Sequence, residues 1–193
     1  MTVLETGRLV LREFQLDDAE FILQLLNESA FLRFIGDKGV RTLADARDYL
    51  LQGPIESYRR FGFGLYLVSL REDGTPIGMC GLVKREGLLD VDVGFALRTR
   101  YCSRGYAVEA AAAVLDYGKR ALNLGRIVAI ANSDNHASIA VLERIGLRFE
   151  RMVQLSGDAT ELKLFGPAAT GGAAAPTGCE AAVGRPAAPA GPA

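Results

Sequence analysis

The chain has 193 residues, of which 49% are hydrophobic and 23% charged, and its formal net charge is −1 at pH 7. This composition suits one globular domain with a substantial core. A near-neutral charge gives no electrostatic footprint for nucleic acid or an anionic membrane, and no apolar run approaches the about 20 residues of a membrane-spanning helix. The first 12 residues already carry Glu5, Arg8 and Arg12 and lack the apolar core of a signal peptide, so we expect a cytoplasmic protein.

The cysteines and the histidine argue against a metal site. Cys80, Cys102 and Cys179 are odd in number and widely spaced, which predicts neither a disulfide framework nor a CxxC metal site. The one histidine, His136, excludes a multi-histidine site and is interpreted as a surface residue in a polar loop. No histidine is obviously paired with Cys80 or Cys102, so a covalent acyl-cysteine is disfavoured and buried packing is the simpler interpretation.

The first third of the chain predicts one strand and several helices. Residues 9–14 alternate as a strand, and Asp17-Asp18 caps a helix with an apolar stripe. A second helix is expected after Thr42, whose hydroxyl suits an N-cap. We expect Gly53-Pro54 to break this helix, with a further helical stretch over residues 55–61.

The remainder predicts a sheet interleaved with helices. Strands are expected over residues 64–70, 76–85, 90–97, 126–131, 148–155 and 160–165, with hairpin turns at Asp73-Gly74 and Gly157-Asp158. An alanine-rich helix follows Ala107, and a second helix over residues 138–145 stops at Gly146. This order predicts an α+β domain over residues 1–166 with a central, mostly antiparallel sheet flanked by helices. The Ala/Gly/Pro-rich residues 167–193 are predicted to form a disordered tail.

Gly105 lies where a loop becomes the alanine-rich helix. The first amides of a helix have no internal partner and the helix dipole is positive there, so the amides of residues 104–108 could hold a diphosphate. Gly105 would allow close approach and Arg104 could add charge, although Gly105 could equally serve only to make the turn. A dinucleotide fingerprint is not present, since no GxGxxG precedes a helix.

The whole pattern resembles a known family, the GNAT acetyltransferases, and more narrowly the branch of ribosomal-protein N-terminal alanine acetyltransferases. Five segments carry the resemblance between about residues 6 and 165: ETGRLVLREF with DDAEFILQLLN, then GTPIGMCGL, DVDVGFAL, RYCSRGYAVEAAAAVLDYG and SDNHASIAVLERIGLRFE. The resemblance implies the GNAT (acyl-CoA N-acyltransferase) fold. It also implies transfer of an acetyl group from acetyl-CoA to a primary amine by direct attack in a ternary complex.

The resemblance also implies where acetyl-CoA binds. The family's diphosphate loop, Q/R-x-x-G-x-G/A, falls on residues 102–107, where Cys102 replaces the usual Gln or Arg, Ser103 a frequent glycine and, just before, Thr99 a frequent proline. The end of the strand over residues 90–97 is expected to bind the pantetheine amides through its main chain, where a β-bulge splays it from residues 126–131. The expected contacts are Phe95, Ala96, Leu97, Arg104, Gly105, Tyr106, Ala107, Val108, Asn135 and Ser138.

Catalytic groups are inferred from the same motifs. Asp92 stands where relatives carry an acidic residue before G-[FY]-A and is the candidate base, although it could instead lie on a solvated strand face. Asp90 is expected on the same face, where two carboxylates could raise one another's pKa. Ser138 is the candidate acid for the leaving thiolate, or simply a first-turn residue capped by Asn135. Glu109 is expected to complement the helix dipole and support the loop.

Other functions stay open at this point. A non-catalytic acyl-CoA sensor or an interaction module could share the fold. The first two helices and Phe61-Gly62-Phe63 are expected to line the acceptor pocket, and a protein N-terminus, a free amino acid or another small amine all fit. Neither nucleic acid nor a membrane is an expected partner, and monomer and homodimer are both compatible.

Overall fold

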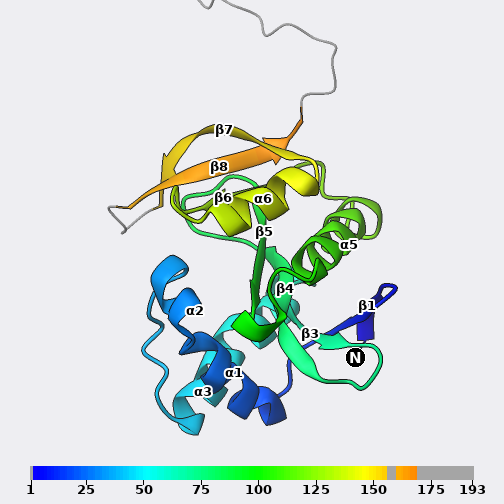
Figure 1. The fold of residues 1–193 in the computed structure, drawn as a ribbon, viewed down its shortest axis with the longest axis vertical. Helices are drawn as coiled ribbons and strands as arrows, with labels where there is room; N and C mark the ends of the chain where they lie inside the picture. Colours follow the sequence, from blue (N-terminus) through cyan, green and yellow to red (C-terminus); the bar gives the residue numbers. More distant parts are fainter. Residues whose placement is uncertain (1, 156–159, 169–193) are drawn as a thin grey trace, which may run out of the picture.

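An eight-stranded sheet with the order β1-β2-β3-β4-β5-β6-β8-β7 forms the centre of the molecule (Figure 1). The computed structural model describes residues 2–155 and 160–168. Within them β5 and β6 pair in parallel, whereas the other neighbouring strands pair antiparallel. The strands are β1 Thr2–Glu5, β2 Leu9–Arg12, β3 Leu65–Leu70, β4 Pro76–Val83, β5 Val91–Leu97, β6 Ile127–Ala131, β7 Leu147–Gln154 and β8 Glu161–Pro167.

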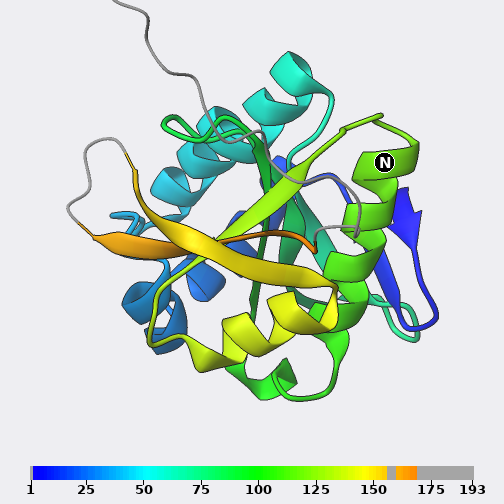
Figure 2. The same ribbon diagram turned by 90° about the horizontal axis from the view of Figure 1, so that it is seen from above.

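Helices cover both faces of this sheet. The helices are α1 Ala19–Leu26, α2 Ser29–Phe34, α3 Leu43–Leu50, α4 Glu56–Phe61, α5 Tyr106–Arg120 and α6 His136–Arg144. Figure 2 shows the blue and cyan helices α1–α4 on one side of the central strands and the green helix α5 on the other. The described part of the chain holds no helix of the length and apolarity that crossing a membrane requires.

The two faces have separate cores, because successive strand residues point to opposite sides. On one face Leu67 and Met79 pack with buried residues of α1 and α3. On the other face Leu82 and Val93 pack with the buried alanines and Val114 of α5. The predicted α+β fold with a mostly antiparallel sheet is therefore confirmed, and the sheet lies between the two cores.

Three features differ from the sequence-based expectations. The strand β1 and the short helix α2 were not predicted; α2 buries only Phe31, which gives too weak an apolar stripe to detect. Gly53-Pro54 does not break the helix. The chain instead continues from α3 through a π-helical turn, Leu51–Ile55, into α4. The wider turn departs from the ordinary hydrogen-bond ladder, which accommodates a proline ring without an N–H.

The predicted end of the domain, residue 166, lies close to residue 168, the last that the structure describes. β8 continues to Pro167, which pairs with Leu147, one residue beyond the predicted boundary. The predicted turn at Gly157-Asp158, the predicted tail beyond residue 168 and Cys179 lie outside the described residues.

Removing the cap of α3 tests the local stability of the helical face. The Thr42 hydroxyl accepts from the Asp45 amide at 3.1 Å, and Asp45 accepts in return from the Thr42 amide at 2.9 Å. We expect Thr42→Ala to lower the free energy of unfolding by about 1 kcal/mol, measured by urea denaturation. Ser133→Ala, at an exposed loop position, is the control, and equal stability of the two variants would contradict the capping role.

Candidate active site

The site begins where β5 and β6 separate. They pair only at Val91 with Ile127 and at Asp92 with Val128. Beyond this point β6 follows β8, whereas β5 stays with β4 in an unbroken register from Asp92 to Leu97. The strands therefore diverge as expected, but the β4–β5 ladder contains no register shift of the kind that the expected β-bulge would introduce.

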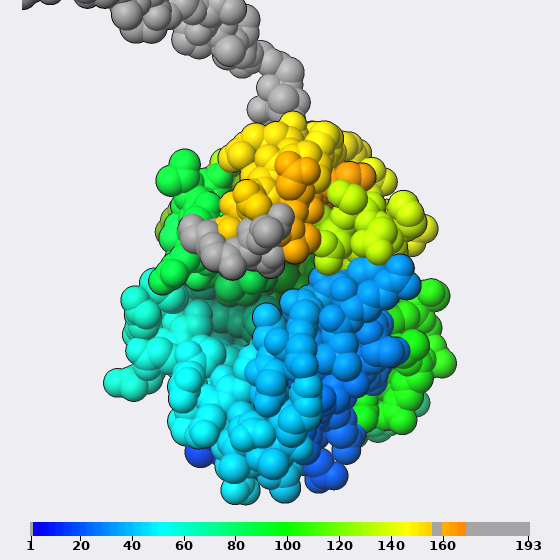
Figure 3. Space-filling view, turned by 90° about the vertical axis from the view of Figure 1, so that its left-hand side faces the viewer, coloured from blue at the N-terminus to red at the C-terminus, as the bar shows by residue number. Residues whose placement is uncertain are grey.

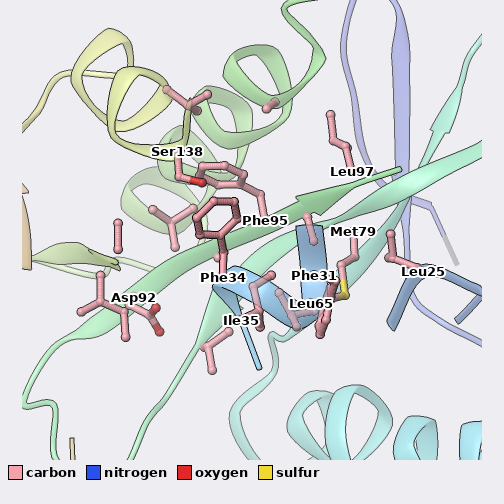
Figure 4. Close-up of a pocket in the computed structure, with 18 of the residues that line it drawn as sticks. Leu25, Phe31, Phe34, Ile35, Leu65, Met79, Asp92, Phe95, Leu97 and Ser138 are labelled. Carbon is pink, nitrogen blue, oxygen red and sulfur yellow. The ribbon is translucent and has the colours of Figure 1, made fainter. Parts of the chain in front are cut away.

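A cleft of about 920 Å³ passes through this gap. Its lining comes from both faces of the sheet: Phe31 and Phe34 of α2 on one side, Tyr106 of α5 and Ser138 of α6 on the other. Figure 3 shows a hollow between the blue segment that carries α2 and the cyan segment that carries α4, with green strand atoms in its depth. In Figure 4, Asp92, Phe95 and Ser138 surround the same pocket.

The free edge of β5 offers backbone groups to this cleft. In an antiparallel ladder, alternate residues direct both N–H and C=O to the same neighbour. The Arg98 amide donates to the Ile77 carbonyl of β4 at 2.8 Å, so Ala96 also faces β4. Phe95 and Leu97 then direct their amides and carbonyls into the gap, and Ala96 contributes only its side chain.

The turn into α5 is the second feature of the cleft. Gly105 is the N-cap with a φ of +82°, a left-handed conformation that favours glycine. Among the described residues, no acceptor is bonded to the backbone amides of residues 103–108. Ser103, Gly105, Tyr106, Ala107 and Val108 line the cleft, so these amides lie beside open space at the positive end of a 15-residue helix.

Arg104 does not contribute as expected. Its guanidinium lies over the Tyr101 ring, 5.8 Å from the centroid, and it is not among the residues that line the cleft. Cys102 does line it, at the position where it replaces the Gln or Arg of the pattern that this loop resembles. The loop therefore presents backbone amides and small side chains rather than a cationic side chain.

The β1–β2 turn braces this loop, through contacts that the sequence analysis did not identify. Glu109 accepts from the Thr6 hydroxyl at 2.6 Å and from the Arg8 amide at 2.9 Å, and its Oε2 lies 2.7 Å from Arg8 Nη2. Arg8 Nη1 donates to the Arg104 carbonyl at 3.1 Å, and the guanidinium lies over the Tyr106 ring. Burial raises the pKa of Glu109, but the hydrogen bonds from Thr6 and Arg8 outweigh it and hold this pKa below its ordinary value.

Asp92 is buried, not solvated, with 1% of its surface exposed. Both of its carboxylate oxygens lie 3.1 Å from Arg85 Nε. Burial raises the pKa of Asp92, and the Arg85 charge and hydrogen bond oppose part of this rise. Asp90 instead accepts from Arg126 Nε at 2.9 Å and does not line the cleft. The raised pKa of Asp92 is therefore caused by burial and not by a second carboxylate.

The start of α6 completes the lining. Asn135 Oδ1 accepts from the Ser138 amide at 3.1 Å, which confirms the cap. Within the described chain, the Asn135 Nδ2 and the Ser138 hydroxyl have no hydrogen-bond partner, and both residues line the cleft. Both side chains thus retain free donors.

Neither described cysteine is set up as a nucleophile. Burial raises the pKa of the Cys80 thiol, which is fully buried in β4. Burial and the charge of Glu28 raise the pKa of the Cys102 thiol. A raised pKa keeps a thiol protonated at neutral pH, and the thiolate is the nucleophilic form.

Comparisons with known proteins agree with this geometry. The sequence model for the acetyltransferase (GNAT) domain matches residues 8–148. An uncharacterized N-acetyltransferase of Bacillus subtilis strain 168, YnaD, is 32% identical over 145 residues, which span 75% of this chain and 82% of that protein. The crystal structure of an acetyltransferase from Agrobacterium tumefaciens C58 superposes with a TM-score of 0.73 at 27% identity, covering 86% of this chain and 94% of that one.

A ribosomal-protein acetyltransferase is also among the solved neighbours. RimL, a ribosomal L7/L12 α-N-protein acetyltransferase solved in complex with coenzyme A, has a TM-score of 0.73. The superposition covers 86% of this chain and 97% of RimL, and at 20% identity it shows a shared fold. Because the family match spans most of the chain and the relatives share its architecture, the protein belongs to the GNAT acetyltransferase family and is an acyltransferase.

Proposed function

We propose that the protein transfers an acetyl group from acetyl-CoA to a primary amine by direct attack in a ternary complex. One observation carries the proposal: Ser103 and residues 105–108, whose amides have no partner among the described residues, line the same cleft that passes between β5 and β6. Backbone amides at a helix N-terminus are suited to a diphosphate, and the free edge of β5 is suited to the amides of a pantetheine arm. A cytoplasmic location and a monomeric or homodimeric state belong to the same proposal.

In this proposal the cofactor contacts are mainly backbone groups. The amides of Arg104, Gly105, Tyr106, Ala107 and Val108 hold the diphosphate. The backbone of Phe95 and Leu97 aligns the pantetheine arm, with Ala96 beside it, and the free Nδ2 of Asn135 donates to the arm from α6. These contacts place the thioester in the gap, between the two faces of the sheet.

Proton transfer falls to one group on each face. Asp92 accepts a proton from the acceptor's ammonium group, directly or through water, and the neutral amine then attacks; burial makes Asp92 a stronger base than an exposed aspartate. The Ser138 hydroxyl, which has no partner among the described residues, donates to the departing thiolate. The acetyl group of acetyl-CoA supplies the electrophilic carbonyl that the amine attacks.

Binding of acetyl-CoA is measured by isothermal titration calorimetry. We expect binding by the native protein and at least about tenfold weaker binding by Gly105→Val. A β-branched residue is strained at a φ of +82°, and its Cβ would lie 3.4 Å from Nη2 of Arg8, which holds the loop. Gly125→Ala is the control, since nothing lies within 4 Å of its added Cβ. No heat from acetyl-CoA with the native protein would overturn the proposed function, and binding without thiol release with any amine would favour a sensor.

Glu109→Ala tests the brace behind the loop. Loss of the Glu109 carboxylate frees Thr6 and Arg8, so we expect acetyl-CoA to bind several-fold more weakly while α5 remains folded. Asp116→Ala on the same helix removes an exposed pair with Arg120 and serves as the matched control. Equal dissociation constants for the two variants would show that the brace does not act on the cofactor loop.

Asp92→Asn tests the base. We expect kcat to fall by about 10²–10⁴-fold with acetyl-CoA affinity unchanged. Because the pKa of Asp92 is raised, the native kcat should decline as pH falls toward a value above the ordinary aspartate range, and the variant should lack this decline. Asp90→Asn, which alters only a surface pair with Arg126, is the control. An unchanged pH profile in the Asp92 variant would remove Asp92 from the proton path.

A further inference from the structure

An arginine lies against the face of β5 that α1–α4 cover. Asp92, Gly94 and Ala96 alternate onto this face, away from α5 and α6. Arg85 follows β4 and enters the same region, where its Nη2 lies 3.9 Å from the position that a Cβ on Gly94 would take. The guanidinium therefore lies beside the segment of β5 at the gap.

Asp92 fixes the direction of this guanidinium. The carboxylate engages Nε alone, with both oxygens at 3.1 Å, and the Arg85 side chain is 36% exposed. Across the described residues, neither Nη1 nor Nη2 of Arg85 has a hydrogen-bond partner. A guanidinium presents its donors as a rigid planar fork, so holding Nε aims the remaining donors into the cleft.

A second cation lines the same cleft as this fork. Lys38, in the loop between α2 and α3, lines the cleft and has neither an ion pair nor a hydrogen bond with any described residue. Burial and the positive charge of Arg85 lower the pKa of Lys38. Two cations that repel each other, with their donors open to one space, favour an anion between them.

The remaining charges of the cleft do not supply that anion. The cationic lining residues are Lys38, Arg60, Lys84, Arg85 and Arg144, and the anionic ones are Glu28, Glu56 and Asp92.

Each of these carboxylates already has a partner. Glu28 accepts from the Thr99 amide at 2.8 Å, Glu56 pairs with Arg59 at 3.2 Å and Asp92 is held by Arg85. Arg60 lies over the Phe61 ring, the Lys84 ammonium donates to the Leu89 carbonyl, and Arg144 lies in the last turn of α6.

We propose that the acceptor is a small amine that carries an anionic group next to its nitrogen, as an α-amino acid does. Arg85 and Lys38 bind the anion, and Asp92 receives the ammonium group. The inference rests on the proposed function and narrows its acceptor. An internal peptide bond would replace this anion in a protein N-terminus, so the arrangement selects a free amino acid over a polypeptide.

Matched acceptors test the inference directly. Each α-amino acid is compared with its carboxamide, which keeps the side chain and the amine but removes the charge, while thiol release from acetyl-CoA is followed. We expect kcat/KM to be about tenfold or more higher for the amino acid, since hydrogen bonds to charged groups are the strong ones. A 1-aminoalkylphosphonate in the same series shows whether a carboxylate or a phosphonate suits the fork better.

Two variants connect the preference to the named residues. We expect Lys38→Met to raise KM for the amino acid about tenfold, with the carboxamide and acetyl-CoA constants little changed. We expect Arg85→Gln to raise the same KM about tenfold and, because it also removes the charge beside Asp92, to change kcat for both acceptors. Lys38→Met leaves the Asp92 pair intact and so keeps the test valid if Arg85→Gln disturbs the fold. Arg47→Gln, at an exposed position of α3 outside the cleft lining, is the control.

The outcomes separate this inference from the transferase activity. Equal kcat/KM for amino acids and carboxamides would overturn the inference and leave the acetyltransferase activity intact. An equal KM for the amino acid in the native protein and the Lys38 variant would do the same. If no amine is acetylated, α-amino acids are titrated into the protein with CoA and their binding is measured by calorimetry. Absence of binding in this titration would overturn the inference. Failure to bind acetyl-CoA itself would instead count against the proposed function.

Discussion

The early separation of β5 from β6 is the constraint on which the site depends. A strand inside a sheet normally satisfies its backbone on both sides, yet β5 shares only two residue pairs with β6 before β6 turns to β8. The rest of β5 is held by β4 alone. The gap connects the face under α5 and α6 with the face under α1–α4. Two reactants can therefore approach one point from opposite sides of the sheet.

This opening has a cost that a ligand can offset. Backbone amides and carbonyls without protein partners must be hydrated or bound, since an orphaned buried group costs as much as a lost hydrogen bond. The cleft is large enough to keep Phe95, Leu97 and the amides of residues 103–108 in contact with solvent. The brace from Arg8 to Glu109 adds rigidity to the loop, so less ordering remains to be done when a ligand binds.

Local signals made part of this site predictable from the sequence. A glycine ahead of an alanine-rich helix and an asparagine three residues before Ser138 are caps, and both lie where the sequence placed them. The contacts of Arg8 and the electrostatic influence of Arg85 on Lys38 were not predictable, because they join segments far apart in the chain. Arg8 meets a residue 101 positions away, and nothing in the spacing of ETGR indicates this. The burial of Asp92 is likewise a tertiary property, since alternation along β5 is equally compatible with a solvated face.

The two sides of the cleft differ in how they present polar groups, and this explains why one was easier to recognise. On the α5 side the groups are backbone amides, which Ser103 supplies as well as a glycine would, whereas the Cys102 amide donates to the Thr99 carbonyl. On the α1–α4 side the groups are side chains, Asp92, Arg85 and Lys38, whose charges depend on one another. Many sequences with one fold can present the same backbone groups to a ligand. An arrangement of charged side chains instead depends on the particular residues of each sequence. The choice of acceptor must therefore be sought on the second side.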